Sequence, residues 1–345
     1  MPMKQQQISL AGAIPLAACL ALALVSLPSH ASDSFRTAFA TSGTLYEDIF
    51  FAQTRPNVYG GIGYKQAHIT DVTDANGHSY QPSPAFKFSN DSTVQQAYLY
   101  AGMVSETQHA GGRWAASIVV PYTHGDKKFT ATNITPNPAY TPAAVFLTQI
   151  NTGTHSKLDD IEINGGWIYS NDRDLKVGLG LALKTKTGGY DAKKPGENIG
   201  TGYYTLKPAM GAVYEMGAFS LAGKATLGIN STNKDANYRS GNVVSLETAA
   251  GYKSPIGAFG INLHSMTQIQ DDTGAGVPFA GGLSYVSPAP ADGKRIKYLT
   301  YSPFYMLPIK PLEGVLMVSL TKFQSSKYSQ EYPLGFQMRF TKTFN

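Results

Sequence analysis

Residues 175–184 read "LKVGLGLALK", and their side chains alternate strictly between two kinds. Successive side chains of a β-strand point to opposite faces, so every second residue shares a face. One face is wholly apolar, and the other holds lysine, glycine and alanine. The pattern therefore predicts a strand with an apolar medium on one side only. The apolar face is Leu175, Val177, Leu179, Leu181 and Leu183.

The next strand along the chain indicates which medium this is. In residues 203–215, "YYTLKPAMGAVYE", the apolar face begins with Tyr204 and ends with Tyr214. A tilted strand of about 9–11 residues crosses a bilayer, and aromatic girdles mark its two interfaces. Pro208 removes one ladder hydrogen bond from the middle of this strand. We interpret the apolar medium as lipid.

Period-two stretches bounded by turn residues recur along the rest of the chain. They predict an all-β fold, a transmembrane antiparallel up-and-down β-barrel of about 12 strands. The predicted strands are 58–70, 94–106, 113–122, 158–169, 175–187, 203–215, 218–230, 243–253, 257–270, 294–306, 313–324 and 334–344.

The predicted connections alternate between long and short. Long ones include "GGYDAKKPGEN" and "NSTNKDANYRSGN", whereas "SNDRD" and "KSPIG" are tight. Transmembrane barrels have short periplasmic turns and long extracellular loops, which a β-sandwich has no reason to reproduce. An even number of strands places both ends of the barrel on the periplasmic side.

The amino-acid composition agrees with a transmembrane β-barrel. Of 345 residues only 15% are charged, against roughly 25% in soluble proteins, while Gly (35), Tyr (21) and Phe (16) are abundant. The net charge of +5 is spread along the chain without a basic run, which argues against a nucleic-acid surface.

The N-terminus has the three parts of a secretory signal peptide. Lys4 precedes an apolar run, and Ser29-His30-Ala31 supplies small residues for cleavage before Ser32. A retained membrane helix is the alternative. We expect a signal peptide at 1–31, a periplasmic lead-in or plug at 32–57, and a bacterial outer-membrane barrel at 58–345.

The single cysteine, Cys19, lies inside the apolar run. "LAAC" resembles a lipobox, so lipidation is an alternative, although the apolar run continues past it to Leu27. Otherwise the exported chain has no cysteine, hence no disulfide or thiolate site.

The polar faces of the strands are expected to point into the barrel. One interpretation is a cross-paired wall that stiffens the barrel; the other is that some of these residues line a solute path and select what passes. The candidates for the lumen lining are Glu162, Lys207, Lys224, Glu247, Asn262, His264, Gln268, Tyr298 and Arg339.

Apparent catalytic motifs do not fit this architecture. "DDTG" (271–274) stands alone and is interpreted as a turn, and "GGIG" (60–63) lies within a strand. The seven histidines lack short metal-ligand spacing. We expect no catalytic residue, metal or cofactor.

The closing strand, "FQMRFTKTFN" (336–345), is amphipathic. Its apolar face, which includes Phe336 and Phe344, is expected to meet lipid, and Gln337 and Arg339 the lumen. Lys342 falls on the lipid side, near the periplasmic rim, where its stem can reach the headgroups.

Several stretches, in order, resemble a known family. They are "LDDIEINGGWIY", "KTKTGGYDAKKPGENIGTGYYTLKPAMGAVYE", "YRSGNVVSLETAAGYKSPIGAFGINLHSMTQIQDDTG" and "SQEYPLGFQMRFTKTFN". Together they are similar to the transporter-like outer-membrane family of the phenol-degradation meta pathway, over residues 55 to 345. Asn57 and the final Asn345 depart from the family pattern, in which glycine and an aromatic residue are common.

The resemblance implies a passive outer-membrane channel for small hydrophobic or aromatic compounds, linked to a catabolic pathway and without enzyme activity. A structural or adhesive barrel that binds external ligands through its long loops is one alternative, and a lipid-modifying enzyme is another. The expected partners are a hydrophobic or aromatic small molecule, outer-membrane lipid and lipopolysaccharide, and the barrel-insertion machinery.

Overall fold

The computed structural model describes residues 56–73, 76–79, 85–138, 141–170, 174–192, 198–274 and 295–344. The expected signal peptide lies outside these residues, as does the expected lead-in apart from Pro56 and Asn57. Within the described chain, no helix is long and apolar enough to cross a membrane.

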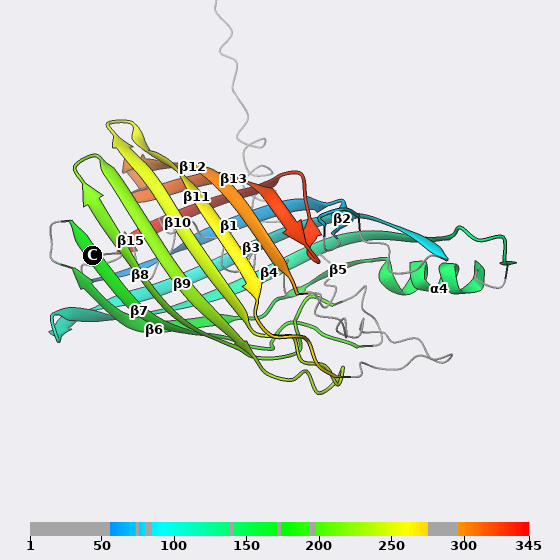
Figure 1. Cartoon of the computed structure of the whole chain (residues 1–345). Helices are drawn as coiled ribbons and strands as arrows, with labels where there is room; N and C mark the ends of the chain where they lie inside the picture. Colours follow the sequence, from blue (N-terminus) through cyan, green and yellow to red (C-terminus); the bar gives the residue numbers. More distant parts are fainter. Residues whose placement is uncertain are drawn as a thin grey trace, which may run out of the picture.

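Twelve antiparallel strands form a closed barrel (Figure 1). They follow one another around the ring in chain order, and β1 also pairs with β15, which leaves no open edge. In a bilayer, closure satisfies backbone groups that would otherwise be unpaired in hydrocarbon. The strands are β1 (Asn57–Ile69), β3 (Phe86–His109), β4 (Gly112–Asn133), β6 (Glu162–Ser170), β7 (Leu175–Lys184), β8 (Thr205–Met216), β9 (Phe219–Asn230), β10 (Val243–Ser254), β11 (Gly257–Gln268), β12 (Lys297–Ile309), β13 (Gly314–Lys327) and β15 (Gly335–Phe344).

All twelve predicted strands are present, and the main errors concern length. β3 and β4 extend well beyond the predicted 94–106 and 113–122, and they form a hairpin that projects past the barrel (Figure 1). Against it lie β5 (Gly153–Leu158) and α4 (Thr141–Asn151), which were not predicted. The predicted strand 158–169 begins later, at Glu162, because residues up to Leu158 pair separately as β5.

The two ends of the barrel differ as predicted. At one end the hairpins close tightly; Ala110 and Gly111, both with positive φ (51° and 77°), join β3 to β4. β1 begins and β15 ends here, since Val58 lies opposite Phe344. The other end carries the long connections and three short elements: β2 (Asp71–Val72), β14 (Gln330–Glu331) and α4. The 3-10 helix η4 (Lys310–Leu312) belongs to a turn at the tight end.

The outer surface of the barrel is an apolar belt. Leu179 and Met210, register partners at the middle of β7 and β8, are 52% and 60% exposed. Toward the tight end the belt becomes aromatic: Trp114 lies opposite Trp167, and the ring of Tyr252 contacts both Phe219 and Phe259. Such an arrangement matches a membrane-spanning belt flanked by an aromatic girdle.

Lys342, the one lysine on the apolar face of the closing strand, lies at the tight rim. Its Nζ is 3.6 Å from a carboxylate oxygen of Glu313, which follows η4 in the β12–β13 turn. The aliphatic stem of Lys342 therefore places the ammonium group at the rim of the belt. The sequence predicted this position.

Candidate functional site

All nine residues predicted for the lumen lie on the inward faces of their strands. Seven are buried, and Glu162 and Lys224 are partly so; their outward neighbours, such as Leu206, Leu246 and Leu263, are exposed. The buried residues are Lys207, Glu247, Asn262, His264, Gln268, Tyr298 and Arg339.

Lysine–carboxylate pairs occupy the inward face from β6 to β10. Lys207 Nζ lies 2.5 Å from Glu162 Oε2, and Lys224 Nζ lies 3.0 Å from Glu247 Oε1, whose side chain is buried completely. Near the tight end, Glu215 lies between Lys176 (3.1 Å) and Lys253 (2.8 Å). This part of the wall is cross-paired, which agrees with the interpretation of a wall that stiffens the barrel.

Apolar and aromatic side chains fill much of the remaining interior. Toward the long-loop end, inward residues of six strands join in one buried cluster with Ile296 and Tyr332: Ala67, Ile69, Val94, Val243, Met266, Tyr298 and Phe323. Its aromatic members form an edge-to-face row. The ring centroids are 5.6 Å apart from Tyr298 to Phe323 and 4.7 Å apart from Phe323 to Tyr332.

His264, another predicted lumen residue, extends this row. Its ring lies edge-on to Tyr298 at 5.4 Å. Tyr332 lies between β14 and β15, and burial raises the pKa of its hydroxyl above the ordinary value. The row therefore begins with an imidazole ring deep in the interior and ends at a neutral phenol near the mouth.

A second inward feature is the tyrosine wall, which consists of Tyr98 and Tyr100 on β3 lying over Gly63 and Gly61 on β1. A Cβ at either glycine would overlap the tyrosine above it. The Tyr100 hydroxyl donates to the carbonyl oxygen of Phe340 (3.0 Å), so the ring spans β1 completely. The tyrosine wall could not be predicted from the sequence, because a Gly-x-Gly opposite a Tyr-x-Tyr has meaning only once the register of the strands is known.

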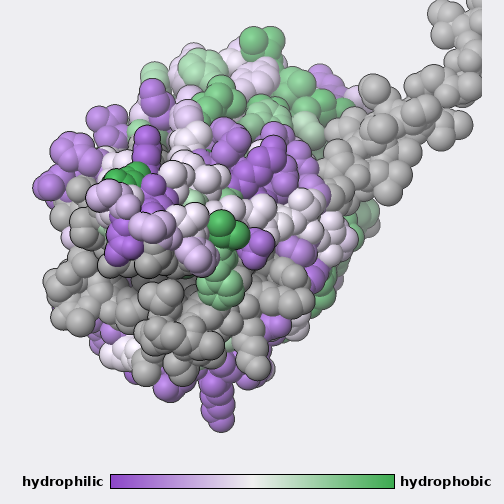
Figure 2. Space-filling view, turned by 90° about the vertical axis from the view of Figure 1, so that its right-hand side faces the viewer, coloured by the Kyte–Doolittle hydropathy of each residue, from purple (hydrophilic) through white to green (hydrophobic). Residues whose placement is uncertain are grey.

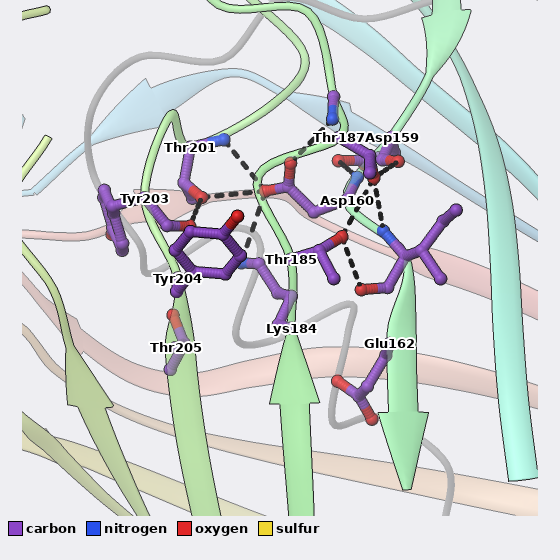
Figure 3. A network of polar contacts seen from close by, with 12 residues as sticks. Asp159, Asp160, Glu162, Lys184, Thr185, Thr187, Thr201, Tyr203, Tyr204 and Thr205 are labelled. Carbon is purple, nitrogen blue, oxygen red and sulfur yellow. Dashed lines mark hydrogen bonds and ion pairs between the residues drawn. The ribbon is translucent and has the colours of Figure 1, made fainter.

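At the mouth, two consecutive aspartates fasten the long connections to the barrel (Figure 3). Asp159 accepts hydrogen bonds from Gln96 (3.1 Å) and Thr123 (3.0 Å), which tie it to β3 and β4. Asp160 accepts from the backbone N–H groups of Gly188 and Thr201, each at 2.9 Å, and from the Thr201 hydroxyl at 2.8 Å. Both carboxylates are buried, so together they hold the β7–β8 connection in place.

The hydrogen bonds continue from the β7–β8 connection to the β9–β10 connection and then to the β11–β12 connection. The Asn233 side-chain amide donates to the carbonyl oxygen of Thr201 (3.0 Å), and the hydroxyl of nearby Tyr238 donates to Asp272 (2.5 Å). Asp272 also accepts from Gln268 (2.5 Å). Gln268, which was predicted to line the lumen, therefore points inward, and its side-chain amide holds Asp272 of the β11–β12 connection. We call this chain from Asp160 to Asp272 the loop network.

Figure 2, which faces the long-loop end, shows hydrophilic residues over much of the described surface there and apolar residues gathered toward the flanks. Among the described residues no group of three or more His, Cys, Asp or Glu side chains is placed to hold a metal ion. What the structure brings together is a partly polar and partly aromatic barrel interior, with hydrogen-bonded loops at one end.

The family model described as "Putative MetA-pathway of phenol degradation" matches residues 59–287. The chain belongs to this family. A comparison with curated proteins finds no significant match.

The barrel was compared with solved structures, and one superposition has a TM-score above 0.5. The COG4313 outer membrane channel from Pseudomonas putida F1 superposes with a TM-score of 0.65 at 14% identity, over 86% of this chain and 98% of that chain. The β domain of the Bordetella autotransporter BrkA has a TM-score of 0.45 at 11% identity, over 84% and 100%. The TodX deltaS2S3 mutant monoaromatic hydrocarbon channel has a TM-score of 0.40 at 11% identity, over 88% and 94%.

At 14% identity, the superposition on the COG4313 channel establishes the fold. A closed barrel of this kind, with an apolar belt and an aromatic girdle, is an integral protein of the bacterial outer membrane. In barrels of this kind the short turns face the periplasm and the long loops face the outside.

Proposed function

We propose that this protein is a passive outer-membrane channel through which small hydrophobic or aromatic compounds enter the cell toward a catabolic pathway. The observation that carries the proposal is the aromatic row Tyr298–Phe323–Tyr332 inside the barrel. A water-filled porin has a polar interior, whereas here a buried apolar cluster crosses from β1 and β3 to β10 and β11. Apolar and aromatic side chains offer a hydrophobic solute an environment that water does not.

Membership of the phenol-degradation family and the channel fold support this assignment. In the proposal, Tyr298, His264, Asn262 and Arg339 line the path. The pairs Glu162–Lys207 and Lys224–Glu247, on the strands from β6 to β10, keep the neighbouring part of the wall rigid and polar. Movement is downhill, so the protein supplies a route and no energy.

The outer surface of the barrel suggests which molecules surround the protein in the proposal. The belt contacts outer-membrane lipid, and the long-loop end contacts lipopolysaccharide. The closing strand, with Phe344 exposed at its end, presents an aromatic side chain to the insertion machinery. Crosslinking from Phe344 in cells tests this last contact.

Uptake across an intact outer membrane tests the function. Cells whose outer leaflet is lipopolysaccharide are expected to accumulate radiolabelled toluene or phenol faster when they express the chain, measured as the initial rate at low concentration. An accelerated rate for glucose in the same cells would point to a general pore, and an unchanged rate for both aromatics would contradict the proposal.

A further inference from the structure

Three lysines lie on the outer surface of the barrel at the long-loop ends of β12 and β13. Lys297 begins β12, Lys327 ends β13, and Lys322 precedes Lys327 in the same strand. All three side chains are exposed. Each lysine has a buried neighbour in its strand: Tyr298, Phe323 and Ser326. Since successive side chains of a strand point to opposite faces, the lysines point away from the barrel interior. We call this outward surface the lysine face.

The positive charge of the lysine face is not balanced by the chain itself. Lys297 and Lys327 lie directly opposite each other in the β12–β13 register, where like charges are destabilising. The strands β11, β12, β13 and β15 contain neither aspartate nor glutamate. Within the described part of the chain, no carboxylate forms an ion pair with any of the three lysines, and Asp271, which follows β11, is paired with Arg295 (2.8 Å).

The tight end of the barrel differs in this respect. There the outward lysine of β15, Lys342, has a carboxylate of the same chain within reach, because its Nζ lies 3.6 Å from Glu313. The unbalanced lysines therefore gather at the end with the long loops, which faces the outside in barrels of this kind.

The lysine face begins where the apolar belt ends. Leu320, the outward residue before Lys322 on β13, is 42% exposed and lies opposite Phe336. The Phe336 ring is 6.5 Å from that of Tyr64, and Tyr301 lies opposite Lys322. Aromatic side chains at this level match the second girdle of a transmembrane barrel. The ammonium groups beyond this girdle therefore lie at the level of the lipid headgroups.

We propose that the lysine face binds the phosphate groups of lipid A, the membrane anchor of lipopolysaccharide. Lipid A carries phosphates on its sugar backbone at the depth of the headgroups, and its acyl chains lie against the apolar belt. Lysine binds phosphate as a point charge, and an anionic lipid surface attracts each lysine near it. The phosphates supply the negative charge that β11, β12, β13 and β15 lack. The inference rests on the proposed contact with lipopolysaccharide and assigns that contact to named groups on both molecules.

Lipid A with and without its phosphates tests the role of charge. The chain from Ser32 onward is refolded from inclusion bodies, so that it carries no lipopolysaccharide, and the two lipids are compared by native mass spectrometry in detergent micelles. EDTA removes divalent cations that bridge phosphate to carboxylate. The phosphorylated form is expected to bind about 100-fold more tightly, since one lysine near an anionic surface contributes about fivefold. Equal binding of the two forms overturns the inference.

Replacement of all three residues of the lysine face by glutamine is expected to abolish the preference for the phosphorylated lipid. A control variant loses the same net charge at three exposed lysines on other elements: Lys87→Gln on β3, Lys234→Gln in the β9–β10 connection and Lys310→Gln in η4. The control is expected to keep the preference. A preference that survives in the first variant, or that is lost in both, overturns the inference.

Stability gives a second readout, which also decides if the triple variant does not fold. Without lipid A, Lys327→Gln should raise the urea midpoint of unfolding, because it removes the repulsion from Lys297. With phosphorylated lipid A present, the same change should lower the midpoint relative to the native chain, because a ligand that binds the folded state stabilises it. A shift of the same sign in both conditions contradicts the site.

The outcome is separable from that of the proposed function. Cells that take up toluene and phenol through a chain that binds both forms of lipid A equally would retain the channel and lose the phosphate site. A chain that accelerates the entry of no aromatic compound would contradict the function, and its binding of lipid A could still be measured.

Discussion

At the scale of the residue, the interior depends on glycines that admit tyrosine rings. Gly61→Val places a side chain where the Tyr100 hydroxyl and the Phe340 carbonyl already lie. Overpacking of this kind typically costs about 1–3 kcal/mol. We expect urea unfolding of the Gly61→Val protein, followed by tryptophan fluorescence, to show a free energy of unfolding lower by that amount.

The control for this change is Gly223→Val on β9, where an added Cβ has no atom within 4 Å. This variant is expected to unfold like the native chain. Equal losses at both glycines would show that the register of β1 against β3 is not as described.

The buried pair Lys224–Glu247 gives a second prediction at this scale. Lys224→Met removes a lysine that lies 3.0 Å from a fully buried carboxylate. Loss of one partner of a buried ion pair costs about 3–5 kcal/mol, so the free energy of unfolding in urea should fall by that order. Lys224→Met combined with Glu247→Leu should recover much of the loss, since the buried charge is then absent; a double variant no more stable than the single one would contradict this.

At the scale of the element, Asp160 decides how firmly the β7–β8 connection is held. Asp160→Ala deletes the acceptor of three hydrogen bonds from Gly188 and Thr201. We expect the connection to become accessible to protease added outside intact cells, with cleavage between residues 185 and 204. Single-channel currents should become noisier for the same reason.

Asp271→Ala is the matched control. Asp271 is exposed, and Arg295 (2.8 Å) lowers the pKa of its carboxyl, but it takes no part in the loop network. This change should leave cleavage at 185–204 unaltered. Resistance of the Asp160→Ala protein to protease would show that other contacts hold the connection.

The sequence predicted the elements better than it predicted their contacts. Alternation of apolar and polar residues located all twelve strands and the inward position of Glu247, His264 and Arg339, because both depend only on local periodicity. The length of the β3–β4 hairpin escaped prediction, since its outer part is stabilised by β5 and α4, which follow it in the chain. The tyrosine wall and the loop network depend on register and on contacts between distant loops, which periodicity does not encode.

At the scale of the whole molecule, the orientation in the membrane makes a depth-dependent prediction. Leu179 lies at the middle of the belt, and Ile256 lies in the tight β10–β11 turn. A lysine at mid-bilayer costs about 2–4 kcal/mol, and about 0–1 kcal/mol near an interface. Unfolding from lipid vesicles should therefore show a large loss for Leu179→Lys and a small one for Ile256→Lys; the reverse order would contradict the assigned belt.

The inner wall of the barrel has two parts with different side chains. The half from β6 to β10 carries cross-paired lysines and carboxylates, and the other half carries tyrosines, cations and the aromatic row. In the proposed channel the paired part stiffens the wall and the aromatic part contacts the solute. The loop network braces the entrance to both.

Single-channel recording in planar bilayers tests the central claim most directly. The chain from Ser32 onward is expected to give small stepwise currents. Micromolar to millimolar aromatic solute should interrupt them briefly, because in the proposed channel the aromatic ring and the ions use the same path. Silence in every condition, or currents that aromatic solutes leave untouched, would contradict a channel for such compounds.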